Sequence, residues 1–212
     1  MRAVILAGGG LAVTPYIRQL SKAQLVIAAD SGLRHARTLG LKPTLIVGDM
    51  DSATAADLEA FESVPLRKFS TDKDYLDLEI AIQEALNAGA TELRLLGALG
   101  SRLDQSLAAI FIAARLKSDG ISVSLHGGTQ DVFLLSHQDK LELELATGQL
   151  FSLLSITDNS VLTLENAHYN LKDTTLKFGV GLAVSNRVKT SPLELNLTSG
   201  LIALIIERGE DV

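Results

Sequence analysis

Short apolar runs that alternate with helical patterns fill the first half of the chain. Apolar runs cover residues 3–7, 25–29 and 45–47, further strands are expected at 93–96 and 122–125, and each of these segments ends near a glycine-containing loop. Helical spacing lies between them, in segments such as 15–21, 53–62 and 104–118. Unbroken apolar runs are typical of strands buried on both faces, and strands that alternate with helices favour a parallel sheet. Residues 1–128 are therefore predicted to form a doubly wound, Rossmann-like α/β domain.

The hydrophobic pattern changes to a period of two in the second half of the chain. The leucines at 141, 143 and 145 alternate with other residues, as do the leucines at 193, 195 and 197. Such alternation indicates strands with one buried face, and further candidate strands lie at 131–135, 149–155, 160–165 and 201–206. The turn residues 198–200 indicate a hairpin. Residues 129–212 are therefore predicted to form an antiparallel β-sandwich domain.

Four loops that follow predicted strands carry glycine, and three of them add aspartate or arginine. These loops are residues 8–10, 30–32, 48–52 and 97–102. All strands of a parallel sheet end at the same edge, and ligands of open α/β folds bind outside that edge. Gly9 and its neighbours allow the backbone to approach a ligand closely. The G-x-G-x-x-G fingerprint is absent, so the loops predict a ligand site but no dinucleotide site.

Asp49 and Asp51 follow the run at 45–47 after Gly48, with one residue between them. In an extended exit from a strand, alternate side chains point the same way, so the two carboxylates are predicted to meet. Oxygen ligands of this kind suit Mg²⁺, which commonly arrives with substrate phosphates. The alternative interpretation is a solvated turn, because Gly, Asp and Ser are common turn residues.

Composition argues against several other classes of function. The formal charge is −6, without a basic run, which disfavours sequence-independent binding of nucleic acid. The absence of cysteine rules out disulfides, thiolate catalysis and cysteine-based zinc sites. The four histidines are scattered along the chain and are expected to be surface or packing residues. No apolar segment is long enough for a signal peptide or a membrane span, so a cytoplasmic protein is expected.

Three segments, taken in this order and spacing, resemble the thiamine pyrophosphokinase family. They are A-A-D-S-G-L-R-H-A-R-T-L-G-L-K-P-T-L-I-V-G-D-M-D-S at 28–52, D-K-D-Y-L-D-L-E-I-A-I at 72–82 and L-L-G-A-L-G-S-R-L-D-Q at 95–105; a further match is L-K-F followed by V-S-N within 176–186. Members of this family transfer a diphosphate from ATP to the hydroxyl of thiamine and release AMP. The resemblance implies Mg²⁺, ATP as co-substrate, and a homodimer whose two active sites are shared between chains.

The resemblance also implies roles for individual residues. Asp49, Asp51 and Asp77 are expected to hold the metal, and Asp74 with Asp77 forms a second acidic cluster near the phosphates. Arg102 is expected to bind phosphate oxygens, because a guanidinium matches them in a bidentate way. The expected site residues are Asp49, Asp51, Asp74, Asp77, Arg102 and Asp104 for catalysis, Gly9, Asp30, Gly32, Asp49, Arg102 and Gln105 for the nucleotide, and Ser185, Asn186 and Phe178 for thiamine.

The chain departs from the family pattern at several positions. Leu76 stands where many members have threonine, Ser31 replaces a glycine, and Arg187 replaces a frequent acidic residue. Phe178 stands where some members have tryptophan. These differences bear on substrate detail, and no residue is identified as the general base. Two alternatives stay open: a pterin diphosphokinase of related architecture, or a nucleotide- or thiamine-binding protein that lost catalysis through the change at Leu76.

Overall fold

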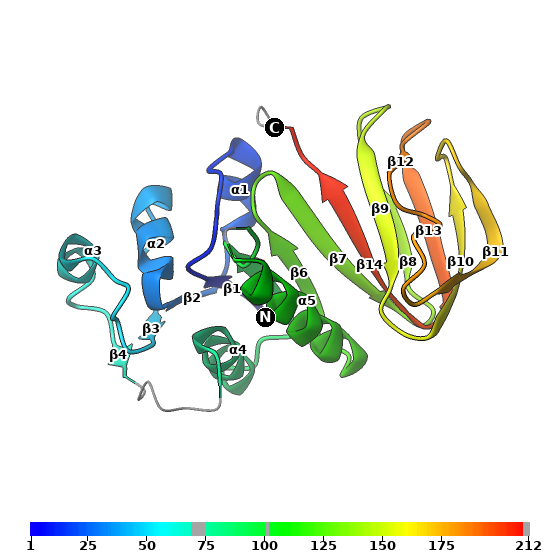
Figure 1. The fold of residues 1–212 in the computed structure, drawn as a ribbon. Helices are drawn as coiled ribbons and strands as arrows, with labels where there is room; N and C mark the ends of the chain where they lie inside the picture. The colour runs from blue at the N-terminus through cyan, green and yellow to red at the C-terminus, as the bar shows by residue number, and fades with distance from the viewer. Residues whose placement is uncertain (69–74, 101, 210–212) are drawn as a thin grey trace. The chain divides into compact units, whose positions relative to one another are not determined.

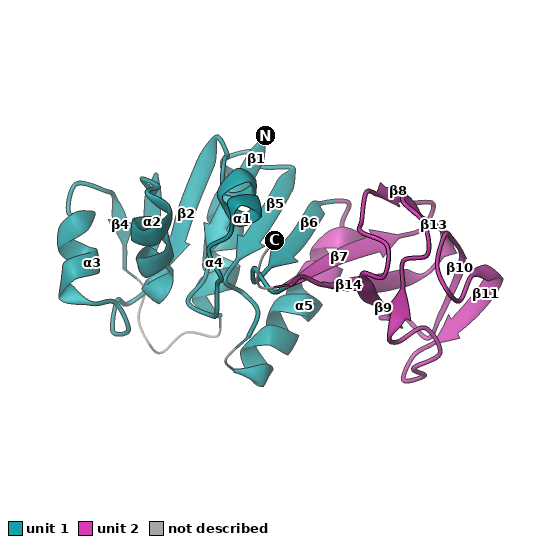
Figure 2. Cartoon of the chain, turned by 90° about the horizontal axis from the view of Figure 1, so that it is seen from above, with its two compact units in different colours: residues 1–112, 121–129, 210–212 teal, residues 113–120, 130–209 magenta. Residues whose placement is uncertain are grey.

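The computed structural model describes residues 1–68, 75–100 and 102–209 (Figure 1). Within this range the chain divides into two compact units, residues 1–112 with 121–129, and residues 113–120 with 130–209 (Figure 2). Each unit contains its own cluster of buried apolar side chains. The end of a helix at 113–118 groups with the second unit, a feature that the hydrophobic pattern does not indicate.

Six parallel strands form the sheet of unit 1 (Figure 1), in the order β6-β5-β1-β2-β3-β4. In β1 and in β2, four of the five residues are buried and aliphatic, as expected for strands covered on both faces. The strands are β1 (Arg2–Leu6), β2 (Leu25–Ala29), β3 (Leu45–Val47), β4 (Leu66–Arg67), β5 (Glu92–Leu96) and β6 (Ser122–His126).

Helices connect consecutive strands and cover both faces of this sheet. Apolar residues of α1 and α2 pack against the face that carries Val4 and Leu6, and α4 lies on the opposite face (Figure 1). The start of α1 is fixed by Thr14, whose hydroxyl accepts the backbone N–H of Ile17 at 3.2 Å. The helices are α1 (Pro15–Leu20), the 3₁₀ helix η1 (Asp30–Gly32), α2 (Leu33–Leu39), α3 (Ala55–Ala60), α4 (Asp77–Asn87) and α5 (Leu103–Ser118).

The order of the strands reverses at β1. The strands β1 to β4 follow one another toward one edge of the sheet, whereas β5 pairs with the other side of β1 and β6 lies beyond it. Such a reversal opens a crevice at the carboxyl ends of the two central strands, which is where doubly wound folds bind ligands. Residues 8–10 after β1 and residues 97–100 after β5 flank this point.

Unit 2 is an antiparallel β-sandwich, as the period of two predicts. One sheet has the order β12-β9-β14-β7 and the other has the order β11-β10-β13-β8. Leu193, Leu195 and Leu197 are buried between the sheets, together with Phe151 and Leu153 from the opposite sheet. The strands are β7 (Gln130–Ser136), β8 (Lys140–Leu143), β9 (Leu150–Ser155), β10 (Asn159–Glu165), β11 (Leu171–Lys177), β12 (Asn186–Arg187), β13 (Leu193–Ser199) and β14 (Leu201–Glu207).

The predicted hairpin at 198–200 is wrong. The strands on either side of it belong to different sheets, because β13 pairs with β8 and β10 whereas β14 pairs with β7 and β9. Gly200 turns the corner with φ 89°, and a Cβ atom there would lie 2.5 Å from the hydroxyl oxygen of Ser160. The hydrophobic pattern does not predict β11 and β12, since β11 is largely polar and β12 has two residues. Among the described residues, no helix is long and apolar enough to cross a membrane.

Candidate active site

A cavity of about 490 Å³ lies at the carboxyl ends of the parallel strands of unit 1. The loops after β1, β2, β3 and β5 line it together with the first residues of α4 and α5. This is the convergence of loops that the sequence predicts from the parallel sheet. Six of the expected site residues line the cavity: Gly9, Asp30, Asp49, Asp77, Arg102 and Gln105.

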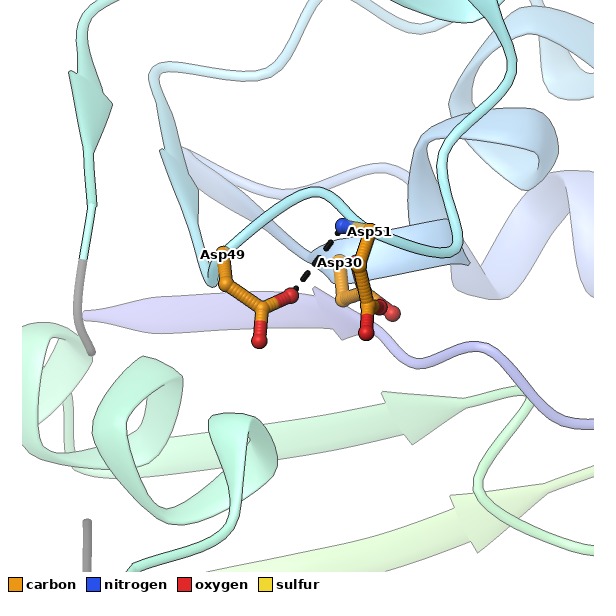
Figure 3. Close-up of side chains that lie close together, drawn as sticks. All are labelled: Asp30, Asp49 and Asp51. Atoms are coloured by element: carbon orange, nitrogen blue, oxygen red, sulfur yellow. Dashed lines mark hydrogen bonds between the residues drawn. The ribbon is translucent and has the colours of Figure 1, made fainter. Parts of the chain in front are cut away.

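Three carboxylates gather beside the cavity. One oxygen from each of Asp30, Asp49 and Asp51 lies within 4.8 Å of the other two (Figure 3). Asp30 and Asp49 are half-buried and Asp51 is exposed. One carboxylate oxygen of Asp30 is buried and has no hydrogen-bond partner among the described residues. Like charges at this spacing repel, and a buried oxygen without a partner is costly, so the cluster has the properties of a cation site.

The backbone of the loop at 48–52 explains how Asp49 and Asp51 meet. The loop is not the extended exit from a strand that the sequence analysis assumed, because Met50 has φ 69°. The buried Met50 side chain joins the core, and the left-handed turn around it brings the two carboxylates to one side (Figure 3). The N–H of Asp51 donates to Oδ1 of Asp49 at 3.1 Å, which fixes the turn. The two carboxylates converge as predicted, but through a left-handed turn at Met50 and not through the predicted extended backbone.

Gly48 allows the loops after β2 and β3 to lie against each other. It has φ 130°, and a Cβ atom there would lie 2.8 Å from the Met50 side chain and 3.2 Å from Cβ of Asp30. The close approach brings Asp30 to the pair formed by Asp49 and Asp51. The family resemblance implies a nucleotide-side role for Asp30 and does not include it among the metal ligands. The adjacency of β2 and β3 was the signal that could have identified it as the third carboxylate.

The second acidic cluster is described only in part. Asp77 begins α4 and lines the cavity, but it is not one of the three carboxylates that lie within 4.8 Å of one another. Asp74 lies outside the described residues. Gly32 is buried and does not line the cavity, and a Cβ atom there would lie 2.0 Å from the Leu6 carbonyl oxygen. Its missing side chain therefore serves the packing of η1 against β1.

Arg102 lines the cavity and forms an ion pair with Asp104. Its Nη2 lies 2.5 Å from Oδ2 of Asp104, and its Nε lies 3.1 Å from Oδ1. The hydrogen bonds of this pair lower the pKa of the Asp104 carboxyl and raise that of the Arg102 guanidinium. Both side chains are mostly exposed. The pair holds a charged guanidinium in place at the cavity without burying it.

The residues expected to contact thiamine all lie in unit 2. Phe178 is 62% exposed, and Ser185 is exposed with φ 61°. Asn186 is only 3% exposed, and its side-chain amide is hydrogen-bonded to backbone groups. Its Oδ1 accepts the N–H groups of Tyr169 (3.2 Å) and Arg187 (2.8 Å), and its Nδ2 donates to the Tyr169 carbonyl at 2.8 Å. Asn186 therefore connects two loops of the sandwich.

Leu76 occupies the N-cap position of α4, where a threonine would serve better. Its N–H already donates to the Glu79 side chain at 3.3 Å, which is one half of a capping box. We expect Leu76→Thr to supply the other half and to stabilise the protein by about 1 kcal/mol, which raises Tm by roughly 2–4 °C at this chain length. Activity should not fall, because the side chain is 39% exposed at the rim of the cavity. Calorimetry with Leu76→Ala as the control tests this, and a severe loss of activity in Leu76→Thr would contradict it.

The buried His35 makes a second testable contribution to stability. Burial lowers the pKa of its imidazole, the hydrogen bond to the Gly9 carbonyl opposes this shift, and the adjacent Arg34 charge lowers the pKa further. The unfolded chain binds this proton near pH 6.5, whereas the folded chain does so only at lower pH. The free energy of unfolding should therefore fall as the pH drops below about 6.5, by at most about 1.4 kcal/mol per pH unit. Urea unfolding of wild type and His35→Gln should show this slope in wild type alone; equal slopes would contradict the account.

The fold and the site together define a class of protein: an enzyme of two units, one a doubly wound α/β unit with an acidic cavity and the other a β-sandwich. A model of the thiamin pyrophosphokinase catalytic domain matches residues 16–125, more than half of the chain. A model of the vitamin B1 binding domain of thiamin pyrophosphokinase matches residues 136–202. The chain therefore belongs to the thiamin pyrophosphokinase family and is a diphosphotransferase, as its sequence motifs predict.

Individual relatives agree with this assignment at low sequence identity. Thiamine pyrophosphokinase of Bacillus subtilis is 23% identical over 206 residues, which cover 95% of this chain and 96% of that protein. The crystal structure of a thiamine pyrophosphokinase from the same organism matches with a TM-score of 0.87, 21% identity and coverage of 99% and 100%. Thiamin pyrophosphokinase of Candida albicans matches with a TM-score of 0.80, 16% identity and coverage of 98% and 90%. These structures share the fold of this chain.

Proposed function

We propose that this enzyme transfers a diphosphate from ATP to the hydroxyl of thiamine in the cavity of unit 1, and releases AMP. The observation that carries the proposal is the gathering of Asp30, Asp49 and Asp51 at the edge where the strand order reverses. Membership of the family supports the choice of substrates. The cavity offers what diphosphate transfer needs: neutralisation of charge, a cation for phosphate oxygens, and a fixed position for both substrates.

The carboxylate cluster fits a divalent cation. Asp30, Asp49 and Asp51 would hold Mg²⁺ through oxygen atoms, the ligands that this ion prefers. The buried oxygen of Asp30 would gain a partner, and the repulsion among the three charges would be relieved. When bound, Mg²⁺ neutralises phosphate oxygens and the charge that develops on AMP. Asp77 lines the same cavity and could complete the acidic surface around the ion.

Arg102 is suited to bind phosphate oxygens that a metal ion would not contact. Its guanidinium is held in a bidentate pair by Asp104, and phosphate oxygens present the same geometry to the same N–H groups. An arriving nucleotide would therefore compete with Asp104 for Arg102. Asp104 keeps the guanidinium at the cavity before the substrate arrives. Gln105 lines the cavity one residue further along α5 and can offer an amide to the nucleotide.

We further propose that the enzyme is a homodimer with shared sites, in which the phosphate residues of one chain act with Ser185, Asn186 and Phe178 of the other. Exposed apolar side chains on both units support an association between copies. They are Leu103, Leu107 and Phe111 along α5, and Phe178, Val180, Leu182 and Val184 in the sandwich. Exposed apolar residues gathered in this way are typical of interaction surfaces. A cytoplasmic location stays a prediction.

The acceptor is tested by offering the enzyme a choice. Purified protein is incubated with ATP, Mg²⁺ and either thiamine or a hydroxymethyl pterin, and the products are identified by mass spectrometry. We expect thiamine diphosphate and AMP in equal amounts, and no pterin product. Formation of the pterin diphosphate alone would favour the pterin diphosphokinase alternative. Binding of thiamine and ATP without turnover would favour a protein that has lost catalysis.

A further inference from the structure

Two neighbouring side chains at the start of α2 bind the same glycine loop. Nη2 of Arg34 donates to the carbonyl oxygen of Gly9 at 2.9 Å and also donates to that of Gly8. Nε2 of His35 lies 2.9 Å from the same oxygen of Gly9. A carbonyl oxygen only accepts, so the His35 imidazole must carry its proton on Nε2. Two donors thus converge on one peptide group.

The other side of the glycine loop is bound by the loop that follows β5. The N–H of Gly9 donates to the Gly97 carbonyl at 2.7 Å, and the N–H of Gly10 donates to the Leu99 carbonyl at 3.1 Å. The His35 ring also packs against this second loop, because a Cβ atom on Gly97 would lie 3.1 Å from its Nε2 and Cδ2. His35 therefore contacts both loops that flank the reversal of strand order.

Neither Arg34 nor His35 lines the cavity, whereas Gly8 and Gly9 do. His35 is 7% exposed, and burial lowers the pKa of its imidazole, which is therefore a neutral donor at physiological pH. The role of Arg34 and His35 must therefore be exerted through the glycine loop. Consecutive glycines rotate more freely than other residues, so this loop needs external bonds to keep one orientation.

We propose that Arg34 and His35 position the loop at 8–10 for the phosphates of the nucleotide, by holding the carbonyl oxygens of Gly8 and Gly9 away from the cavity. The proposal rests on the proposed function, in which a nucleotide occupies that cavity. A carbonyl oxygen that turned into the cavity would present negative charge to the phosphates and raise the free energy of binding. Arg34 and His35 are positioning residues: neither lines the cavity, and both act through Gly8 and Gly9, which do.

Nucleotide affinity, measured apart from turnover, tests the proposal. The probe is ATP with a methylene group between its α- and β-phosphorus atoms, which cannot release AMP, and its binding with Mg²⁺ is followed by titration calorimetry. We expect His35→Leu to weaken binding about tenfold, the size of one hydrogen bond to a positioned group. His35→Gln, which keeps an N–H donor at the place of Nε2, should restore affinity to within about twofold. The KM for thiamine should stay the same in both variants.

The exposed Arg34 gives a second, independent pair of variants. Arg34→Met should weaken binding of the nucleotide analogue, and Arg34→Lys should recover part of it. Arg37→Met is the control, because Arg37 lies on the same helix but pairs with the buried Asp57 at 2.8 Å. This control should lower Tm without changing nucleotide affinity. If His35→Leu does not fold, Arg34→Met decides the question.

The outcomes separate this inference from the proposed function. If wild type binds the analogue and both His35→Leu and Arg34→Met bind it equally well, the positioning role is wrong and the proposed function stands. If wild type itself does not bind the analogue with Mg²⁺, both are wrong. An equal loss of nucleotide affinity in Arg37→Met would show that destabilising α2 is enough to weaken binding. This result would also overturn the positioning role.

Discussion

Replacing Asp49 with asparagine is expected to abolish diphosphate transfer while the protein stays folded. Asparagine keeps the size of the side chain and one oxygen, but it removes the charge that a divalent cation requires. We expect activity to fall by more than about a hundredfold, since even residues that only support metal ligands typically cost ten- to hundredfold. Asp51→Asn should behave in the same way. Steady-state rates at ordinary Mg²⁺ concentration measure the effect.

The same substitution should not destabilise the metal-free protein, and this separates a lost ligand from a lost fold. The three carboxylates lie within 4.8 Å of one another, so removing one charge relieves repulsion. Mg²⁺ at a hundred times its Kd should stabilise wild type by about 2.7 kcal/mol and should do little for Asp49→Asn. Asp119→Asn, at an exposed position outside the cavity, is the matched control. Near-normal turnover in Asp49→Asn would show that the carboxylates do not hold the metal.

Two inactive variants are expected to restore activity when they are combined in one dimer. In the proposed homodimer, Asp49→Ala disables the phosphate half of a site. Asn186→Ala disables the thiamine half, because it leaves the N–H and C=O of Tyr169 and the N–H of Arg187 without their partner. In a mixed dimer one shared site carries both lesions and the other carries neither. Random pairing makes half of the dimers mixed, so activity should recover to roughly a quarter of wild type.

The structure adds a control to this experiment. Asn186 is buried, so its truncation should also lower the free energy of unfolding, by about 2–3 kcal/mol for the groups left unpaired. The Asn186→Ala homodimer must therefore be shown to be folded by circular dichroism at the assay temperature. Phe178→Ala, which truncates an exposed side chain, is an alternative second lesion that spares the core. No recovery in mixed dimers, once their formation is demonstrated, would place each site within a single chain.

Much of unit 1 could be predicted from the sequence because its strands are buried on both faces. The runs at 25–29 and 45–47 coincide with β2 and β3, and each ends at a loop that glycine makes possible. The fold of unit 2 could be predicted less completely from the sequence. A period of two tells which side chains face the core, but it does not tell which sheet a strand joins. The corner at Gly200 was therefore mistaken for a hairpin.

The candidate site was predictable in its position and less so in its geometry. Parallel strands must end at one edge, so the convergence of the loops followed from the fold class. The left-handed backbone of Met50 did not follow, because a non-glycine residue adopts it only when its surroundings impose it. Asp30 joined the cluster through the pairing of β2 with β3, which no local pattern specifies. The motif that contains Asn186 likewise does not reveal that the side-chain amide of this residue is hydrogen-bonded to the backbone.

The transfer of an intact diphosphate group is tested most directly with ATP that carries radioactive phosphorus at its β position. In one-step transfer to thiamine, the bond between the α- and β-phosphates breaks, so all of the label should appear in thiamine diphosphate and the AMP should be unlabelled. The reaction should require Mg²⁺ and should be lost in Asp49→Asn. Label recovered in ADP, together with an unlabelled thiamine phosphate, would mean that the enzyme transfers single phosphates and would contradict the account.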